Sequence, residues 1–336
     1  MAAVATSRGI ALRPHAKTHK CPAVAARQLA AGAVGLTVAT LGEAEAFADA
    51  GVDDLFVAYP LRSGEDTGRR IEALARRAHL AVGADSVVSV TMLGRALPPG
   101  TPLTVLVEVD CGLRRTGVVP YEADRVAAAI ADAGLEVGGI FTFPGHSYQP
   151  GATAGAVADE EKALRAAAQA VATRGLPCPV RSGGSTPTAA DTPGGAVNEL
   201  RPGVYVFNDA QQVALGTCRA EDVALAALGT VVSAPVPERI VLDAGSKVLG
   251  ADRPSWVHGH GLLPDHPGAV VTGLWEHHAV VDVSEVAAAD RPVLGERVAI
   301  VPNHVCTAVN LAPALHVVDG GQVVARWQIT ARDRNR

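Results

Sequence analysis

Between residues 9 and about 208, short runs rich in β-branched residues alternate with longer, alanine-rich runs patterned with charges. This alternation is typical of strand, helix, strand, helix. The strand-like runs are eight in number, at 9–15, 34–40, 54–59, 79–83, 103–110, 137–143, 178–182 and 200–207. Helical runs between them include 21–31, 42–50, 68–78, 121–133 and 153–174. Eight such units predict an α/β fold, a closed (β/α)8 barrel of the TIM type, which we favour over a doubly wound open sheet.

After about residue 225 the pattern changes to consecutive strand-like runs, punctuated by glycine, proline and aspartate. These runs lie at 227–233, 239–243, 269–275, 279–283, 297–301, 315–318 and 322–329. Strands that follow one another without long helices predict a second, smaller and mainly β domain. We therefore expect the barrel to span residues 1–222 and the β domain to span residues 223–336.

The composition narrows the class of protein. Hydrophobic residues make up 48% of the chain and charged residues 19%, which is typical of a globular protein with a core. With 29 basic and 34 acidic residues and no basic run, the chain is not expected to bind nucleic acid. No apolar run approaches the roughly 20 residues of a membrane span, and the first residues do not resemble a signal peptide. Five cysteines without a Cys-x-x-Cys pair argue against a disulfide framework. We expect a cytoplasmic protein that does not enter a membrane.

Polar and glycine-rich segments follow five of the predicted strands. They are residues 13–20, 110–115, 144–148, 182–186 and 201–203. The catalytic groups of a (β/α)8 barrel lie at the C-terminal ends of its strands. Any one of these loops could simply be solvated, but five at one end of a barrel indicate a functional site.

The segment after the first strand contains a candidate nucleophile. Alternate residues of an extended segment share a face, which would put His15, Lys17 and His19 together. A partly buried lysine near other cationic groups has a lowered pKa, the condition for a Schiff-base lysine. Lys20 is an odd number of positions from Lys17, so on an extended strand it would face the other way. The plainer interpretation is a solvent-facing lysine between two polar histidines.

The segment at 182–186 contains small residues, hydroxyl groups and a backbone that can turn its N–H groups toward an anion. Gly203 could add another such donor. These features suit a single phosphate monoester, although a plain glycine-rich turn explains them equally well. Neither a Walker motif nor Gly-x-Gly-x-x-Gly is present, so nucleoside triphosphates and dinucleotides are poor candidates.

His304 and Cys306 follow a predicted strand of the β domain. On an extended backbone they would lie on the same side and could chelate a soft or borderline metal such as Zn2+. Two protein ligands leave positions for water or substrate, as in a catalytic site. The alternative is a buried cysteine beside an ordinary histidine. Six other side chains could supply a third metal ligand, and their spacing in the sequence does not single one out. They are Asp243, His258, His260, Glu276, His277 and His278.

Six segments together resemble the D-serine dehydratase and D-threonine aldolase family, whose members are pyridoxal-phosphate enzymes of the alanine-racemase fold type. They are residues 13–20, 144–148, 182–186, 199–209, 243–247 and 302–306. The first reads Arg-Pro-His-Ala-Lys-Thr-His-Lys and the last Pro-Asn-His-Val-Cys. The resemblance covers nearly the whole chain in the right order, and it implies the barrel and the β domain.

The resemblance also implies roles by position. Lys17 matches the lysine that binds pyridoxal 5'-phosphate covalently, and His15 lies beside it. Arg115 matches an arginine near the phenolic oxygen of the cofactor, and Arg201 matches the arginine that meets the pyridine nitrogen in alanine racemases. Other cofactor-binding positions are His146 and Tyr148 in the pocket and Ser185, Thr186, Gly203 and Val204 around the phosphate. His304 and Cys306 match the metal pair, in the thiolate form that is more similar to D-serine dehydratases than to aldolases with a carboxylate there.

Two departures from the family are visible. Family members usually begin with an additional strand and helix, whereas only sixteen residues precede Lys17 here, so we expect the β domain to lack that strand. Residues 276–278 read Glu-His-His where the family more often has Glu-Glu-His. His277 and the preceding Trp275 therefore differ, and we expect the substrate preference to differ with them.

These observations predict a lyase that acts on a small D-3-hydroxy amino acid and uses pyridoxal 5'-phosphate with Zn2+ or another divalent metal. We expect conversion of D-serine to pyruvate and ammonia, with retro-aldol cleavage of D-threonine as the alternative. The resemblance implies a homodimer. An amino-acid racemase would have no use for the metal pair, and non-catalytic barrels that bind pyridoxal phosphate normally lack the second domain.

Overall fold

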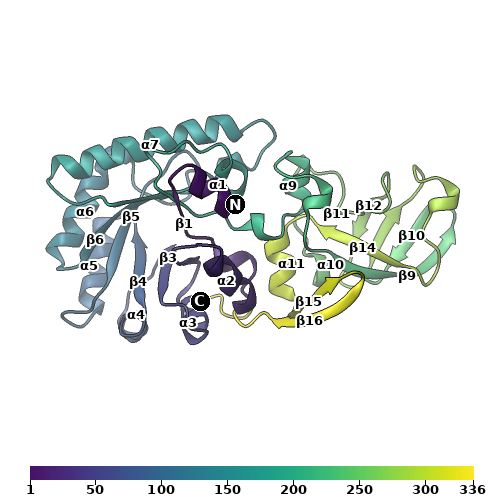
Figure 1. The fold of residues 1–336 in the computed structure, drawn as a ribbon, viewed down its shortest axis with the longest axis horizontal. Coiled ribbons are helices and arrows are strands. Elements are labelled where there is room, and N and C mark those ends of the chain that lie inside the picture. The colour runs from purple at the N-terminus through teal and green to yellow at the C-terminus, as the bar shows by residue number, and fades with distance from the viewer. The chain divides into compact units, whose positions relative to one another are not determined.

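The computed structural model describes residues 1–336, and the chain forms two compact units. Unit 1 comprises Met1–Gly203 together with Asp333–Arg336, and unit 2 comprises Val204–Arg332. In Figure 1 the first 203 residues run from purple to teal, and unit 2 continues from green to yellow.

Unit 1 contains eight parallel strands. They are β1 (Ala11–Leu12), β2 (Leu36–Val38), β3 (Asp54–Pro60), β4 (His79–Ala84), β5 (Thr104–Glu108), β6 (Glu136–Phe141), β7 (Val180–Gly183) and β8 (Glu199–Leu200). Each strand from β2 to β7 pairs with the next in sequence, and β8 pairs with β1. The N–H of Val34 donates to Leu12 O and the N–H of Thr37 to Pro14 O, both at 2.9 Å, which joins β1 to β2. The sheet therefore closes, and the predicted barrel is confirmed.

The helices of unit 1 connect the strands, and Figure 1 shows α4, α5, α6 and α7 around the outside of the sheet. The helices are α1 (Ala2–Ser7), α2 (Pro22–Ala30), α3 (Leu41–Asp49), α4 (Glu65–Ala75), α5 (Val87–Ala96), α6 (Ala123–Asp132), α7 (Thr153–Thr173) and α8 (Thr186–Ala189). Side chains cap several of them, as Thr40 does when it accepts the N–H of Glu43 at the start of α3. Because the helices cover one face and the barrel interior covers the other, all five residues of β5 are buried.

The interior of the barrel is filled by side chains. Phe56, Ala81, Leu106 and Phe141 form a buried cluster, in which the two phenylalanine rings meet edge to face with centroids 5.0 Å apart. Gly83 leaves room for this cluster, since a Cβ there would lie 2.6 Å from Phe141 Cζ. The barrel is a packed core rather than a pore.

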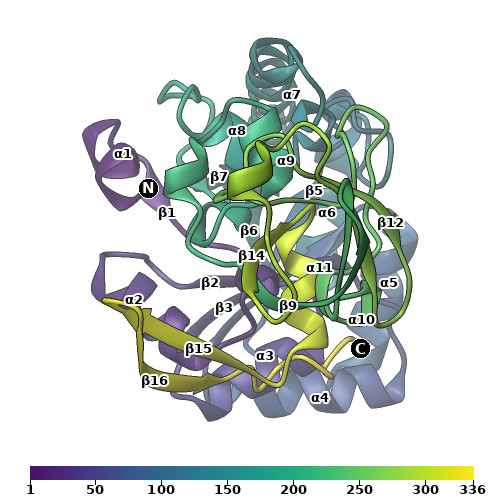
Figure 2. The same ribbon diagram turned by 90° about the vertical axis from the view of Figure 1, so that its right-hand side faces the viewer.

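Unit 2 is mainly antiparallel β structure (Figure 2). Its strands are β9 (Ala227–Val236), β10 (Arg239–Leu242), β11 (Gly261–Leu262), β12 (Val270–Leu274), β13 (Ala279–Asp282), β14 (Arg297–Pro302), β15 (Ala314–Asp319) and β16 (Gln322–Gln328). Six of them form one sheet in the order β11-β14-β9-β10-β13-β12, and β15 and β16 form a hairpin. Three short helices accompany them, α9 (Ala210–Ala214), α10 (Ser246–Leu249) and α11 (Val305–Leu311). Val231, Leu242, Val281 and Ile300 lie in the apolar core of this unit.

Two predicted strands are reduced to two residues each. The strand predicted at 200–207 ends at Leu200, and residues Val204–Val206 form a 3-10 helix, η4. The strand predicted at 9–15 pairs regularly only at Ala11–Leu12. Pro202 and Pro14 explain both corrections, because a proline has no N–H to donate to a strand ladder. No helix of the chain combines the length and the apolar character that a membrane crossing requires.

Candidate functional site

Lys17 lies just beyond the end of β1, in a single 3-10 turn, η1 (Ala16–Thr18). The expectation of an extended segment here is wrong, so alternate residues do not share a face. His15 precedes the turn and caps it, because its Nδ1 accepts the N–H of Lys17 at 3.4 Å. Burial and the neighbouring cations, Lys17 first among them, hold the pKa of the His15 imidazole well below its usual range. His15 is therefore a neutral acceptor that shapes the lysine turn.

His19 follows the lysine turn as its C-terminal cap. Its ring is fully buried, contacts Cys21 and Gln28 at 3.1 Å, and meets the ring of Phe47 edge to face. Burial lowers the pKa of His19 to about 4. Its Nδ1 lies 3.1 Å from both the N and the O of Cys21, and its Nε2 lies 3.1 Å from Gln28 Oε1. His19 stabilises the loop.

Lys20 is also part of the structure of this loop. It is buried and has a positive φ of 48°. Its Nζ lies 3.2 Å from Glu43 Oε1 and donates to Asn335 Oδ1 at 2.6 Å. A lysine held in this way is not available for covalent chemistry.

Two cations meet over one aromatic ring. Lys17 Nζ lies 5.6 Å from the centroid of the Phe143 ring, and the guanidinium carbon of Arg115 lies 5.2 Å from it. The Tyr148 ring lies beside Phe143, with centroids 6.4 Å apart. Three predicted site residues from three different loops thus lie around Phe143. The sequence did not predict Phe143 as a site residue. Its position directly before the Pro144-Gly145-His146 motif is the one signal that could have indicated it.

His146 lies in a 3-10 turn, η3 (Gly145–Ser147), after β6. Its Nε2 is 3.3 Å from Asp159 Oδ2 on α7. The next residue, Ser147, is buried, and its hydroxyl is 2.9 Å from the hydroxyl of Ser185 in the loop after β7. The loops after β6 and β7 are therefore joined by side chains.

The loop after β7 begins α8. Ser185 caps this helix, since its hydroxyl accepts the N–H of Thr188 and the hydroxyl of Thr188 accepts the N–H of Ser185. Thr186, the first residue of α8, is buried. Gly203 lies against the lysine turn, because a Cβ there would be 2.7 Å from Thr18 Oγ1. Val204 is buried and begins η4.

Arg201 lies in the barrel interior. Its guanidinium carbon is 5.7 Å from the centroid of the Phe56 ring and 5.2 Å from that of Phe141, and it donates to the carbonyl of Thr142. Burial lowers its pKa, while the carboxyl groups of Glu199, Glu108 and Glu160 act in the opposite direction.

In unit 2, His304 and Cys306 lie at the start of α11 rather than on extended backbone, so that expectation is wrong. The side chains still meet. Burial alone would lower the pKa of His304, but the charge of Cys306 and the hydrogen bonds to Asp209 and Cys306 raise it to about 10. Asp209 Oδ2 lies 3.3 Å from His304 Nδ1 and accepts the N–H of Val305 at 3.1 Å.

Asp209 itself is completely buried and fixed at both oxygens, since Oδ1 accepts the N–H of Gln212 at the start of α9. A carboxylate behind a histidine is a common support for a metal ligand. No group of three or more His, Cys, Asp or Glu side chains is arranged to hold a metal ion. None of the expected third ligands joins the pair; Asp243, for example, accepts the N–H of Thr230. The pair offers a borderline nitrogen and a soft sulfur, with further positions left to water or substrate.

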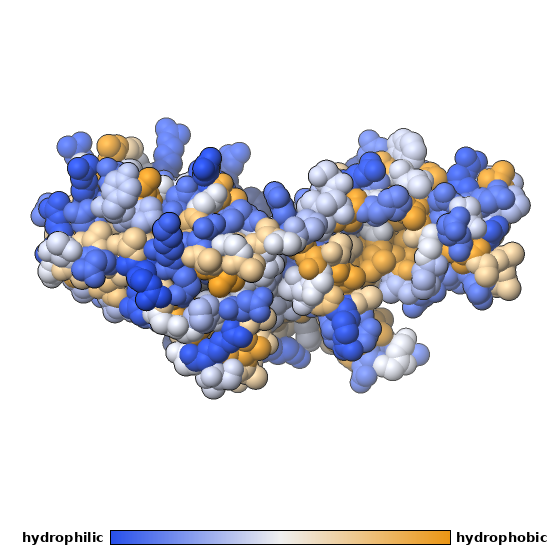
Figure 3. Space-filling model, turned by 90° about the horizontal axis from the view of Figure 1, so that it is seen from above, coloured by the Kyte–Doolittle hydropathy of each residue, from blue (hydrophilic) through white to orange (hydrophobic).

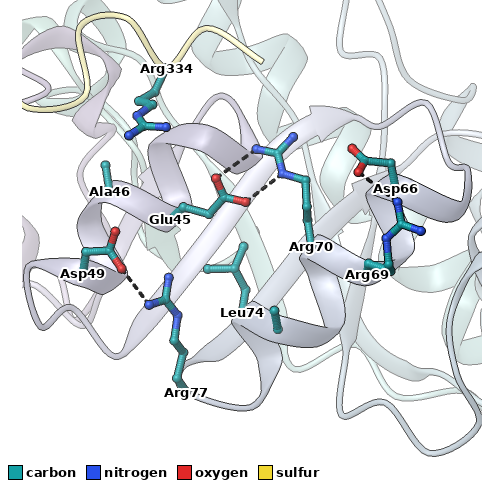
Figure 4. Close-up of a pocket in the computed structure, with 10 residues that line it drawn as sticks. Glu45, Ala46, Asp49, Asp66, Arg69, Arg70, Leu74, Arg77 and Arg334 are labelled. Atoms are coloured by element: carbon teal, nitrogen blue, oxygen red, sulfur yellow. Dashed lines mark hydrogen bonds and ion pairs between the residues drawn. The ribbon is translucent and has the colours of Figure 1, made fainter.

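A surface hollow lies elsewhere, on the outer surface of unit 1 (Figure 4). It measures about 370 Å3 and is lined by residues of α3 and α4 together with Arg77 and Arg334. Arg70 donates to both oxygens of Glu45, and Arg77 donates to Asp49 at 2.6 Å. None of the predicted site residues lines this hollow, and its arginines on α4 already have carboxylate partners.

The sequence matches two known families over most of its length. The profile described as "Alanine racemase, N-terminal domain" matches residues 2–211, and the profile described as "Putative serine dehydratase domain" matches residues 224–318.

Three curated relatives align with nearly the whole chain. D-threo-3-hydroxyaspartate dehydratase of Delftia sp. is 36% identical over 346 residues, which are 96% of this chain and 90% of the relative. D-threonine aldolase of Arthrobacter sp. is 35% identical, covering 100% of this chain and 89% of the relative. D-serine dehydratase of Dictyostelium discoideum is 27% identical, covering 94% and 88%.

Solved structures with the same fold include enzymes of the same kinds as these relatives. The crystal structure of D-threonine aldolase from Filomicrobium marinum superimposes with a TM-score of 0.90 at 33% identity, covering 99% of this chain and 91% of that one. A cysteine-to-alanine mutant of D-threo-3-hydroxyaspartate dehydratase in the metal-free form superimposes with a TM-score of 0.89 at 34% identity, covering 97% and 92%.

Proposed function

Because the chain belongs to the alanine racemase-like family that includes D-threonine aldolase and D-threo-3-hydroxyaspartate dehydratase, we propose that it is a pyridoxal-phosphate- and metal-dependent lyase that dehydrates D-serine to pyruvate and ammonia. Lyase activity on a D-hydroxy amino acid follows from the family. The identity of the reaction and the substrate is our proposal. The observation that carries it is the His304 and Cys306 pair with Asp209 behind the histidine.

The residues of unit 1 fit pyridoxal 5'-phosphate. Lys17 supplies an amine beside a second cation, Arg115, over the Phe143 ring. Gly203 leaves a space against the lysine turn that a Cβ would fill. Ser185 and Thr186 supply hydroxyl groups for a phosphate, and His146 and Tyr148 would line the pocket. Arg201 would meet the ring nitrogen from inside the barrel.

The residues of unit 2 fit a divalent metal of borderline character. His304 and Cys306 would bind it, and Asp209 would keep the imidazole in position. A thiolate favours Zn2+ over Mg2+ or Mn2+.

The cofactor, the metal and the protein side chains would each contribute a different part of the reaction. When bound, the cofactor provides an electron sink for the charge left on Cα, and the metal provides a Lewis acid for the β-hydroxyl group. Lys17 would hold the cofactor covalently, be released by the amino group of the substrate, and then accept the Cα proton on Nζ. Arg115 and Phe143 would keep the lysine and the cofactor in position relative to one another.

D-threonine aldolase activity is the second candidate, because a relative with that activity aligns with the whole chain. Cys306 favours dehydration. Solved structures of D-threo-3-hydroxyaspartate dehydratase include a histidine mutant and a mutant of a cysteine two positions further on, the latter in the metal-free form. His304 and Cys306 have the same spacing, and the resemblance associates a carboxylate at the second position with aldolases.

Product analysis separates these activities. The holoenzyme is incubated with D-serine, D-threonine and D-threo-3-hydroxyaspartate. We expect pyruvate and ammonia from D-serine, and 2-oxobutyrate rather than glycine from D-threonine. Glycine and acetaldehyde as the main products would establish the aldolase. Loss of optical activity without these products would indicate a racemase, and an inert protein that binds cofactor would be a non-catalytic binder.

We also propose a homodimer. Large hydrophobic side chains are exposed on unit 2, among them Leu228, Val232 and Trp275. Leu228 and Val232 lie on the same face of β9, and Figure 3 shows hydrophobic side chains gathered on one face of unit 2. Sedimentation at micromolar concentration is expected to give a dimer, and a fully active monomer would contradict this.

A further inference from the structure

A buried carboxyl group lies directly behind the glycine-rich loop that follows β7. Glu160 is in the middle of α7 and has no exposed surface. Its Oε1 accepts the N–H of Gly184 at 2.6 Å, and its Oε2 has no hydrogen-bond partner. This side chain is therefore committed to a single backbone group of the loop.

The loop is shaped to receive this carboxyl group. A Cβ at Gly183 would overlap Glu160 Oε1, so a larger residue there would displace the carboxyl group. Gly184 has a φ of +83°, and a Cβ there would lie 2.6 Å from Leu200 Cδ2. The turn at Gly183–Gly184 is thus enclosed by α7 on one side and β8 on the other.

Glu160 is a costly residue for this position. The buried face of α7 is otherwise mainly apolar, with Ala156, Ala163 and Leu164 among its residues. Burial raises the pKa of Glu160 to about 7, against the opposing effects of the Gly184 N–H and the Arg201 charge. A buried carboxyl group with one hydrogen bond destabilises a helix packing surface unless that hydrogen bond is needed.

We propose that Glu160 is a positioning residue of the phosphate-binding loop. By holding the N–H of Gly184 from behind, it fixes the turn so that Ser185 and Thr186 present their donors to the phosphate of the cofactor. Ser185 is held from the other side by Ser147, at 2.9 Å. The inference rests on the proposed function, because it requires that this loop binds a phosphate group.

The test compares two ligands that differ only in the phosphate group, pyridoxal 5'-phosphate and pyridoxal. Their affinities for the apoprotein are measured by absorbance titration. In Glu160→Ala we expect the affinity for pyridoxal 5'-phosphate to fall about tenfold, the effect of losing one buried hydrogen bond. The affinity for pyridoxal is expected to change less than about twofold, because pyridoxal does not use the loop.

Two further variants keep the test decisive. Glu160→Gln retains an acceptor oxygen at the same place and is expected to keep the preference for the phosphate. Glu160→Asp shortens the side chain by one methylene, withdraws the acceptor from Gly184, and is expected to lose that preference. The control is Glu161→Gln, the next residue of α7, whose carboxylate pairs with Arg165 at 2.9 Å instead.

Equal losses for both ligands in Glu160→Ala would show a merely structural role and overturn the inference, as would an unchanged preference in a folded Glu160→Asp. If Glu160→Ala does not fold, Glu160→Asp and Glu160→Gln decide between these outcomes. Failure of the wild-type protein to bind either ligand would instead overturn the proposed function.

Discussion

The two units supply the proposed functional groups in opposite ways. In unit 1, Lys17, Arg115 and Phe143 come from three loops that lie far apart in the sequence and meet only because the strands close into a barrel. In unit 2, His304 and Cys306 are almost neighbours at the start of one helix. Their support, Asp209, lies 95 residues before His304 in the sequence. A short motif can therefore provide ligands, but in both units their orientation depends on distant residues.

This contrast has a functional consequence. The groups proposed to bind the cofactor lie mainly in unit 1, and the pair proposed to bind the metal lies in unit 2. Substitutions should therefore separate cofactor binding from metal binding, and the predictions below proceed from the largest expected effect to the smallest.

Lys17→Ala is expected to abolish both activity and the visible absorbance of covalently bound cofactor, because no other amine is placed to replace Lys17. The metal content is expected to stay unchanged, which ties the loss to unit 1. Absorbance spectra, product assays and metal analysis on the same sample check this.

Lys20→Ala is the matched control for that variant. It leaves Glu43 buried without its ion-pair partner, which for a buried pair costs about 3–5 kcal/mol of folding free energy. Covalent binding of the cofactor is expected to persist in the folded fraction. An intact cofactor spectrum in Lys17→Ala, or its absence in folded Lys20→Ala, would break the assignment.

Cys306→Ala is expected to remove most of the activity and the bound metal while the cofactor absorbance remains. Cys306→Asp should be less severe when Mn2+ or Mg2+ is supplied, since a carboxylate is a harder ligand that suits these ions. Activity assays with each metal in turn measure the effect. Full activity of a metal-free Cys306→Ala protein would make the His-x-Cys spacing accidental.

Asp209→Asn tests the support of the proposed metal pair in unit 2. Loss of the carboxylate behind a histidine ligand lowers metal affinity by about 10- to 100-fold, and we expect an effect in this range from competition titrations with a chelator. Asp243→Asn is the control, because Asp243 binds the N–H of Thr230 and does not contact the pair. Equal metal affinities in the two variants would remove Asp209 from the site.

The structural role of His19 can be tested through the pH dependence of stability. Its pKa is about 4 in the folded protein and about 6.5 when unfolded, so the unfolded state binds the extra proton between these values. Stability should therefore fall as the pH is lowered from 6.5 to 4, by about 3 kcal/mol from this residue. His19→Gln is expected to flatten that part of the profile in urea unfolding, and the exposed control His79→Gln is not. Matching profiles for wild type and His19→Gln would contradict this.

The barrel was predictable from the sequence because burial of both faces of parallel strands imposes the alternation of apolar strands and amphipathic helices. The eight strands of unit 1 lie where that pattern placed them, although β1, β2 and β8 are much shorter than predicted. The local shape of the site was not predictable. The residues at 15–19 read as extended, but they turn at η1. Pro14 ends regular pairing just before them.

Residues that act through tertiary packing were also missed. Glu160 lies in the run Asp-Glu-Glu-Lys at 159–162, which reads as a solvent-exposed face of a helix, yet it is buried against the loop after β7. Phe143 reads as a core residue at the end of a strand, yet its ring lies close to the cationic groups of both Lys17 and Arg115. A sequence pattern shows which face of a helix or strand is apolar. It does not show which distant loop a side chain contacts, and the positions of Glu160 and Phe143 depend on such contacts.

The most direct test of the account is removal of the metal from the holoenzyme by a chelator, with cofactor absorbance and pyruvate formation from D-serine followed together. We expect activity to fall to near zero and to return with added Zn2+, while the absorbance stays nearly unchanged. Full activity in the metal-free enzyme, or loss of the cofactor in step with the metal, would contradict a division of the two functions between the two units.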